Sequence, residues 1–254
     1  MKLPYGEDTL REMELWPFIE LQQRSRLPPV APLTGVDAPP PARPALPPRS
    51  SAAVAPSPAP ADPARGTRIA QLDWPGLTAE SAACQACGLC RQRKQAVLGV
   101  GATDAPWLFV GEGPGSEEDE QGEPFVGPAG KLLDAMLAAA GLQRGREVYI
   151  ANVVKCRPPG NRTPSADEAL ACAPFLDRQI DLIQPKLIVA LGKTALTRLT
   201  GSEASMGSMR GRRHDYRGIP VVATYHPAYL LRNLPEKLKA WEDLMLAKKT
   251  LAAL

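Results

Sequence analysis

The feature that most constrains the fold is a regular alternation of short apolar runs and amphipathic stretches in the second half of the chain. Four runs are rich in Leu, Ile, Val and Ala, and each leads through a loop into a segment with apolar residues at helical spacing. These runs are WLFVG (107–111), VYIANVV (148–154), KLIVALG (186–192) and IPVVATYH (219–226). Strands that alternate with helices pair in parallel, because each helix carries the chain back across the sheet. We therefore predict an α/β fold, a three-layer α/β/α sandwich with a central, mainly parallel four-stranded sheet.

The predicted helices are marked by their spacing and by residues typical of helix ends. The best-marked start is at Ser165, because Ser165 and Glu168 make a capping box in which each side chain accepts from the other residue's backbone N–H. Helical stretches follow the apolar runs at 128–141, 165–183, 193–200 and from about Pro235 to the C-terminus. One helix after each strand is the arrangement that covers both faces of a parallel sheet.

Proline divides the chain into parts. Of the 28 prolines, 13 lie between Leu27 and Pro63, and this composition favours an extended chain over a packed core. We predict a short amphipathic N-terminal segment (1–26), a Pro/Ala-rich disordered linker (27–68) and a folded domain (69–254). Residues 9–21 (TLREMELWPFIEL) predict a short helix, which is either a docking peptide or an element that folds back onto the domain.

Charge and hydropathy exclude several classes of protein. A formal charge of +3 and a pI near 8.6 permit nucleic-acid binding without arguing for it. There is no run of 18 apolar residues that would predict a membrane-spanning helix, and the N-terminus lacks the apolar core of a signal peptide. We therefore expect a cytoplasmic protein, and in that compartment close cysteine pairs bind metal more often than they form disulfides.

The cysteines predict a metal site. CQACGLC places Cys84, Cys87 and Cys90 three residues apart, while Cys156 stands in a loop and Cys172 in the following helix. Zinc sites usually repeat a close pair, whereas one close pair plus two separated cysteines suits an iron–sulfur cluster better. The spacing alone leaves zinc open, and it also leaves open that Cys172 packs as a small apolar residue.

Polar and glycine-rich loops follow the predicted strands. In an open parallel sheet, ligands bind outside the carboxyl ends of the strands. The loop GEGPGSEED (111–119) combines glycines, which let backbone approach a ligand, with carboxylates for proton work at Glu112 and Glu118. The GKT at 192–194 is not a phosphate-binding loop, because the upstream glycine of that motif is replaced by Leu187.

His226 is one of two histidines in the chain. A single histidine is often structural, but His226 follows a strand end and precedes Pro227, which fixes the backbone beside the imidazole. This placement favours a site residue that hydrogen-bonds an oxygen gaining negative charge in a transition state. His214 stands among cations in RGRRH, so we expect it in a surface loop.

Three stretches together are specific enough to indicate a family. GEGPGSEEDEQGEPFVGPAGKLLDAML, ANVVKCRPPGNRTP and HPAYLLRN closely resemble the family 4 uracil-DNA glycosylases, which carry a [4Fe–4S] cluster. The resemblance runs from about Cys84 to Leu246. It implies an enzyme of base excision repair that hydrolyses the N-glycosidic bond of uracil in DNA and leaves an abasic site, with the base flipped into a pocket at the carboxyl edge of the sheet.

The resemblance also implies roles for single residues. Phe125 stacks on the uracil ring, Asn152 hydrogen-bonds the uracil edge with its donor and acceptor, and His226 stabilises the oxygen of the departing uracil anion. The best-known uracil-DNA glycosylases have an Asp that activates water at the position of Gly113 in this chain. The resemblance places Gly113 against the substrate. Glu112 and Glu118 are then the carboxylates that can activate the water molecule. We expect both to be needed, and the sequence does not decide which of them is the general base.

A related departure concerns thymine. Gly115 stands where those enzymes carry the aromatic residue that excludes thymine, so discrimination against thymine is open.

The expected cofactor is a structural [4Fe–4S] cluster. The resemblance implies Cys84, Cys87, Cys156 and Cys172 as its ligands. Cys90 has no counterpart among the ligands of the family and is either a bystander thiol or a substitute ligand.

The expected partner is uracil-containing DNA, bound by a monomer. We expect Leu230 or Leu231 to insert into the gap left by the flipped base, and Arg157 and Arg232 to contact phosphates. A repair or replication protein docking on residues 9–21 is a further hypothesis. Alternatives are an iron–sulfur electron carrier, a module that binds damaged DNA without cutting it, and a glycosylase of the same fold with another lesion preference.

Overall fold

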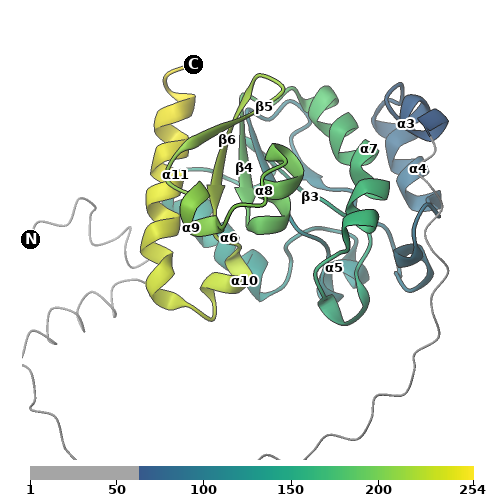
Figure 1. Cartoon of the computed structure of the whole chain (residues 1–254), viewed down its shortest axis with the longest axis horizontal. Coiled ribbons are helices and arrows are strands. Elements are labelled where there is room, and N and C mark those ends of the chain that lie inside the picture. Colours follow the sequence, from purple (N-terminus) through teal and green to yellow (C-terminus); the bar gives the residue numbers. More distant parts are fainter. Residues whose placement is uncertain (1–62) are drawn as a thin grey trace, which may run out of the picture.

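The computed structural model describes residues 63–254, which form a central sheet with helices packed on both faces (Figure 1). The strands are β1 (Val100–Gly101), β2 (Trp107–Gly111), β3 (Val148–Asn152), β4 (Leu187–Leu191), β5 (Arg213–Tyr216) and β6 (Ile219–Thr224). Their order in the sheet is β1-β3-β2-β4-β6-β5. The inner four strands are parallel, and β1 and β5 pair antiparallel at the two edges. The α/β fold class is confirmed.

The predicted count of four strands is wrong, because the sheet has six. The four apolar runs are the four inner strands, whose residues in β2, β3 and β4 are all buried. The two edge strands carry no such signal: β1 has two residues, and β5 has the sequence RHDY with one buried residue. Charged, short edge strands are typical, because they discourage pairing with other chains. His214 therefore lies in a strand and not in a surface loop, with its Nε2 2.6 Å from the Met209 carbonyl oxygen.

The helices pack in two layers. They are α3 (Pro63–Ile69), α4 (Trp74–Ala83), α5 (Ser116–Gln121), α6 (Pro128–Ala139), α7 (Ala166–Ile183), α8 (Lys193–Thr200), α9 (Met206–Met209), α10 (Pro227–Leu230) and α11 (Lys237–Leu251), with 3₁₀ turns η1 (Gly88–Arg91), η2 (Pro159–Asn161) and η3 (Leu234–Glu236). One core joins the sheet to α3, α4, α7 and α8. The other core joins it to α6, α10 and α11. Both faces of the sheet are therefore covered, as predicted.

The helix ends follow the sequence closely. Ser165 Oγ accepts from the Glu168 N–H at 3.2 Å, and a Glu168 carboxylate oxygen accepts from the Ser165 N–H at 2.8 Å, so the predicted capping box is present. The last helix begins at Lys237, just after the expected Pro235. No helix within 63–254 is long and apolar enough to span a membrane.

The domain boundaries remain predictions. The N-terminal segment, including 9–21, and the linker as far as residue 62 lie outside the described residues. The last residues of the predicted linker, 63–68, belong to α3, which packs against α7.

The carboxyl ends of the four parallel strands share one edge, which lies at the bottom of Figure 1, where α5 and α10 follow β2 and β6. The loops that leave this edge meet there and form the candidate site.

Candidate active site and cysteine site

A cavity of about 470 Å³ opens at the carboxyl edge of the sheet. It is lined from three of the four strand-end loops, while the 191–195 loop is not among its walls. The lining residues are Glu112, Gly113, Pro114, Gly115, Ser116, Glu117, Glu118, Phe125, Gly127, Pro128, Ala129, Asn152, Pro158, Asn161, Arg162, Thr163, His226, Ala228, Tyr229 and Arg232. The structure thus brings the predicted residues Glu112, Glu118, Phe125, Asn152 and His226 together at one pocket. Its volume suits a small planar ligand.

Phe125 is held in an unusual backbone conformation. Its φ is +57°, a left-handed value that costs a residue with a side chain about 1–2 kcal/mol. The Arg144 guanidinium compensates by donating to the carbonyl oxygens of Pro124 and Phe125, each at 2.8 Å, while its Nε donates to Asp134. The backbone of Gly130 approaches so closely that a Cβ there would lie 1.8 Å from the Phe125 oxygen. Arg144 and Gly130 therefore fix the ring of Phe125 in the pocket wall.

The floor of the pocket carries an unsatisfied acceptor. Asn152 ends β3 and is 1% exposed, yet its Oδ1 has no hydrogen-bond partner among the described residues. Opposite it, a Cβ on Gly111 would lie 2.5 Å from both Asn152 Oδ1 and the Phe125 ring, so only glycine leaves room there. An orphaned buried acceptor is costly, at about 1–3 kcal/mol, unless a ligand supplies the donor. Asn152 is therefore prepared for a ligand that carries an N–H.

His226 stands neutral beside Phe125. Its Nδ1 accepts from the Ala228 N–H at 3.2 Å, so the proton of the neutral ring is on Nε2. Burial lowers the pKa of His226 to about 4, and this outweighs the attraction of Glu118. The two rings lie 5.5 Å apart between centroids. The site thus presents a neutral imidazole that donates from Nε2.

The two candidate carboxylates have different surroundings. Glu112 lines the pocket, and its Oε2 accepts from Thr194 Oγ1 at 2.5 Å, while its second oxygen has no partner in the described part of the chain. Glu118 accepts from the Gly115 N–H through one oxygen and from the N–H groups of Val126 and Gly127 through the other, at 3.0–3.1 Å. Glu118 therefore organises the loop, and Glu112 has an oxygen left for a water molecule.

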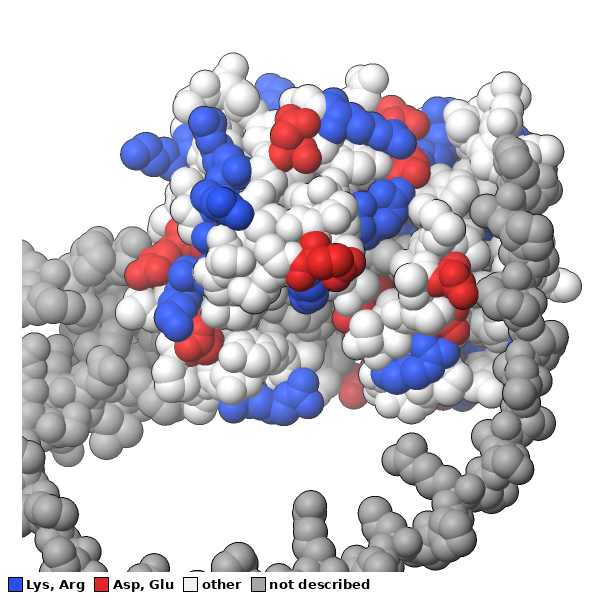
Figure 2. Space-filling model, in the orientation of Figure 1, with Lys and Arg blue, Asp and Glu red and all other residues white. Residues whose placement is uncertain are grey.

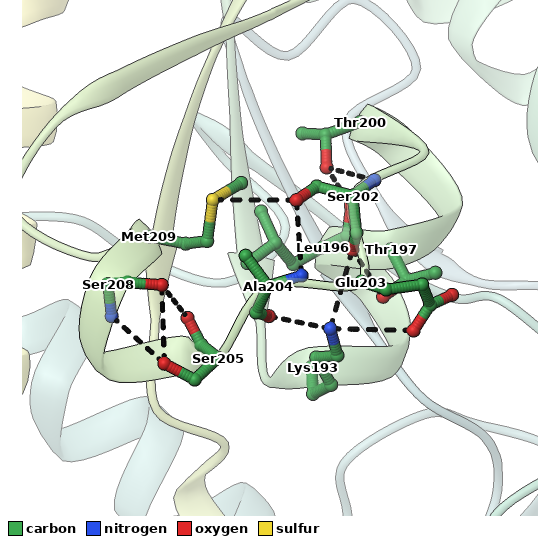
Figure 3. Close-up of polar contacts among 10 residues, drawn as sticks. All are labelled: Lys193, Leu196, Thr197, Thr200, Ser202, Glu203, Ala204, Ser205, Ser208 and Met209. Carbon is green, nitrogen blue, oxygen red and sulfur yellow. Dashed lines mark hydrogen bonds and ion pairs between the residues drawn. The ribbon is translucent and has the colours of Figure 1, made fainter.

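The GKT stretch does not form a phosphate site. Figure 3 shows Lys193 turned toward the loop after α8, where its Nζ donates to the carbonyl oxygens of Ser202 at 3.4 Å and Ala204 at 2.6 Å. Glu203 lies 3.6 Å from the same Nζ. Lys193 is thus engaged in closing a loop, as expected from the missing glycine, and Thr194 points to Glu112 instead.

The predicted DNA contacts divide into two groups. Leu230 is fully buried in the core beneath α10, so it cannot insert into DNA, and this part of the prediction is wrong. Leu231 is 40% exposed, and the neighbouring Arg232 lines the pocket with no side-chain partner in the described chain. Arg157 lies outside the pocket wall and donates to Asn161 Oδ1 at 2.7 Å. Basic and acidic side chains are interspersed over the face seen in Figure 2.

A second, small cavity is lined by all five cysteines. It lies between α4, η1, the loop after β3 and α7, with Ser81, Arg93, Lys155 and Phe175 also in its wall. Burial raises the pKa of the Cys87 and Cys156 thiols, and raises that of Cys172 to about 12. Among residues 63–254, no group of three or more His, Cys, Asp or Glu side chains is arranged to hold a single metal ion.

Four of the five cysteine sulfurs accept a hydrogen bond. Arg65 donates to Cys84 at 3.3 Å, Arg93 to Cys156 at 2.8 Å and the Lys155 N–H to Cys172 at 3.3 Å. The Leu89 N–H donates to Cys87. No donor within 63–254 reaches the sulfur of Cys90. In addition, the Ser81 hydroxyl is 1% exposed, lines the cavity and has no partner in the described structure. This donor set fits a group bound by the four predicted cysteines.

Three contributors to the site are not identified as site residues by the sequence analysis. Arg144 contacts Phe125 and Thr194 contacts Glu112, and in each pair the two residues are far apart in the sequence. No local spacing therefore identifies Arg144 or Thr194 as a site residue. Lys155 is buried and its Nζ donates to the Asn152 carbonyl oxygen at 2.8 Å and to Gln179. A lysine beside a cysteine in a loop is a weak signal, although a charged residue among apolar ones could have indicated a buried contact.

Comparison with known proteins gives consistent matches. The model of the Uracil DNA glycosylase superfamily matches residues 98–245, which hold all five pocket residues named above but begin after Cys90. The chain is 49% identical over 169 residues to a type-4 uracil-DNA glycosylase of Thermotoga maritima, covering 65% of this chain and 88% of that protein. It is 46% identical over 173 residues to the type-4 uracil-DNA glycosylase of Sulfurisphaera tokodaii, covering 65% and 78%. A type-5 uracil-DNA glycosylase of Thermus thermophilus is 32% identical over 149 residues, covering 51% and 68%.

Proposed function

Because the chain belongs to the uracil-DNA glycosylase superfamily, and within it to the type 4 enzymes, we propose that it hydrolyses the N-glycosidic bond of uracil in DNA. The product is an abasic site, which base excision repair then processes. The observation that carries this proposal is the orphaned Oδ1 of Asn152 in a pocket walled by Phe125 and a neutral His226. Uracil has a partner for each of these groups. Its flat ring can stack on Phe125, its N–H can donate to Asn152, and its oxygen that gains charge can accept from His226.

Base recognition rests on Asn152 and Phe125. The Asn152 Oδ1 accepts from the uracil N3–H, and its amide nitrogen donates to a carbonyl of the same edge. The Phe125 ring stacks on the flipped base, which has left the DNA stack at a cost of a few kcal/mol. Glycine at 111 and 113 keeps Asn152, Phe125 and Val154 in place, since a Cβ at either position would lie less than 3 Å from one of these side chains.

His226 supports departure of the base. As the glycosidic bond breaks, its electron pair moves onto uracil, and a carbonyl oxygen of the base becomes negative. The Nε2–H of the neutral imidazole donates to this oxygen, and a fixed donor of this kind contributes about 10²–10³ in rate. The sugar left behind is oxocarbenium-like and is attacked by water.

Glu112 is the proposed water activator. Thr194 holds one carboxylate oxygen, which leaves the other to accept a proton from water. The three N–H bonds of Glu118 support a positioning role in which it keeps the Gly115 and Val126 backbone in place. Both carboxylates are then needed, for different reasons.

On the DNA, we propose that Leu231 fills the gap left by the base and that Arg232 contacts a phosphate. Arg157 is a further candidate for a phosphate contact, with its guanidinium shared with Asn161.

We further propose that Cys84, Cys87, Cys156 and Cys172 hold a [4Fe–4S] cluster, supported by their shared cavity and their four donors. When bound, such a cluster supplies cross-links between the elements that carry its thiolates. These elements include the loop after β3, whose other end bears Asn152.

The test is cleavage of a labelled oligonucleotide with one deoxyuridine, followed by alkali, beside a thymine control. We expect strand scission at uracil and little at thymine. Binding to the uracil strand without scission would refute the enzyme and leave a module that recognises damage. Scission at thymine of equal rate would refute the assigned specificity.

A further inference from the structure

The cysteine cavity has side-chain donors that none of the motifs or comparisons assigns. Two arginines from different parts of the chain point at cysteine sulfurs. Arg65 lies in α3, which precedes both the matched superfamily region and the first cysteine. Arg93 follows η1.

Arg93 joins the two cysteine-bearing segments. Its Nη1 donates to Cys156 Sγ at 2.8 Å, and its Nη2 donates to the carbonyl oxygens of Ala82 at 2.5 Å and Cys84 at 3.1 Å. One planar guanidinium therefore links the loop after β3 to the end of α4. A lysine could not make this set of bonds, because its ammonium has no fork of donors in one plane.

Arg65 does not line the cavity itself but contacts three residues that do. Its Nη2 donates to Cys84 Sγ at 3.3 Å, its Nη1 donates to the Ala171 carbonyl oxygen at 2.8 Å, and its guanidinium lies 5.1 Å from the centre of the Phe175 ring. The Ala171 and Phe175 contacts attach α3 to α7 next to Cys172, and the Cys84 contact attaches α3 to the end of α4. A guanidinium beside a cysteine sulfur stabilises the negatively charged sulfur of a bound ligand more than a neutral thiol.

Ser81 completes the set. Its hydroxyl is buried against the cavity and has no acceptor in the described structure, so it has a donor available. We propose that Arg65, Arg93 and Ser81 are the hydrogen-bond donors of the iron–sulfur cluster, which keep it in the chain and raise its reduction potential. The proposal rests on the proposed cofactor.

The physical reason is charge. A cubane bound by four thiolates carries net negative charge, and one-electron reduction adds to it. Hydrogen bonds and positive groups at the sulfurs stabilise the reduced form more, which moves the potential upward. The same contacts delay the escape of a ligand sulfur, and with it the loss of iron.

The experiment compares single variants of the full-length, iron-loaded chain. We expect Arg93→Met to release iron to a chelator about tenfold faster than the unaltered chain, with Arg65→Met and Ser81→Ala less affected. All three should have a more negative potential in a redox titration followed by visible absorbance. Arg91→Met is the matched control, because Arg91 is exposed and donates to no cysteine sulfur.

The possible results distinguish a failure of the donor assignment from a failure of the proposed cofactor. Equal iron release and equal potentials in Arg93→Met, Arg65→Met and Arg91→Met would overturn the donor assignment while leaving the cluster in place. An unaltered chain that excises uracil but holds no iron would overturn the cofactor itself and not the glycosylase. If Arg93→Met does not fold, Arg93→Lys is measured in its place. Its rate of iron release should lie between that of the unaltered chain and that of Arg65→Met.

Discussion

The uracil pocket and the cysteine site are built in opposite ways. In the pocket the backbone does most of the shaping, through glycines, a positive φ at Phe125 and N–H groups that hold Glu118, and the reactive atoms are left without partners. In the cysteine site four sulfurs already accept hydrogen bonds, two of them from arginine side chains. The difference agrees with the proposed functions, in which the pocket exchanges its ligand in every cycle and the cysteine site keeps a cluster bound.

This contrast predicts that pocket variants lose activity and keep iron. Visible absorbance of the cluster, measured beside each rate, reports whether a variant has kept its iron. A pocket variant that also loses iron would show that the two sites are not independent.

The largest effect is expected for Glu112→Gln. The amide keeps an oxygen for Thr194 but cannot take a proton from water, so kcat should fall by about 10²–10⁴. Single-turnover cleavage of a uracil oligonucleotide measures it. Glu118→Gln is the companion variant and should lower Tm, because an amide nitrogen cannot accept the loop N–H bonds. If Glu118→Gln keeps its Tm and loses more activity than Glu112→Gln, the two roles are reversed.

A smaller loss is expected for Arg144→Met. The variant removes two donors from the Phe125 segment, and bonds from a charged group are worth about 1.5–3 kcal/mol. We expect kcat/KM to fall about ten- to hundredfold. Arg146→Met is the control, since Arg146 is largely exposed and pairs only with Glu147 among the described residues. Equal losses in both variants would mean that the loss of one positive charge explains the effect, and not the loss of the Arg144 hydrogen bonds to the Phe125 segment.

Thr194→Val should cost less again. It removes the hydroxyl that orients Glu112 while keeping the shape, so we expect about a fivefold fall in kcat with KM unchanged. Thr194→Ser restores the hydroxyl and should restore most of the rate. A serine variant as slow as the valine variant would refute a role for the hydrogen bond.

The smallest effect concerns pH. In the proposed mechanism the neutral form of His226 is the donor, so its contribution is present above its pKa and is lost only as pH falls through about 4. An unshifted histidine would be about tenfold depleted of its neutral form at pH 5.5. We expect the imidazole NMR signals of His226 to be unchanged between pH 7 and 5.5, with the His214→Gln variant identifying them. Protonation near 6.5 would contradict the assigned neutral donor.

The sequence predicts the parts of this molecule that follow a local rule. Each inner strand is an apolar run. His226 is expected at the site because it follows a strand run and precedes Pro227, whereas Asn152 is assigned there by the resemblance to the family 4 uracil-DNA glycosylases. Arg144 and Thr194 follow no such rule, because their partners are distant in the sequence and their side chains are ordinary surface types. Leu230 was misplaced because the helical turn of α10 directs it into the core while its neighbour faces solvent.

One short segment belongs to both sites. Asn152 ends β3 at the pocket floor and Cys156 faces the cysteine cavity, and every residue from 152 to 156 is buried. Lys155 ties the two ends further, since its Nζ bonds the Asn152 carbonyl and its N–H bonds Cys172. The length of this segment is therefore fixed from both directions. A single inserted residue here would displace a uracil contact and a cluster ligand together.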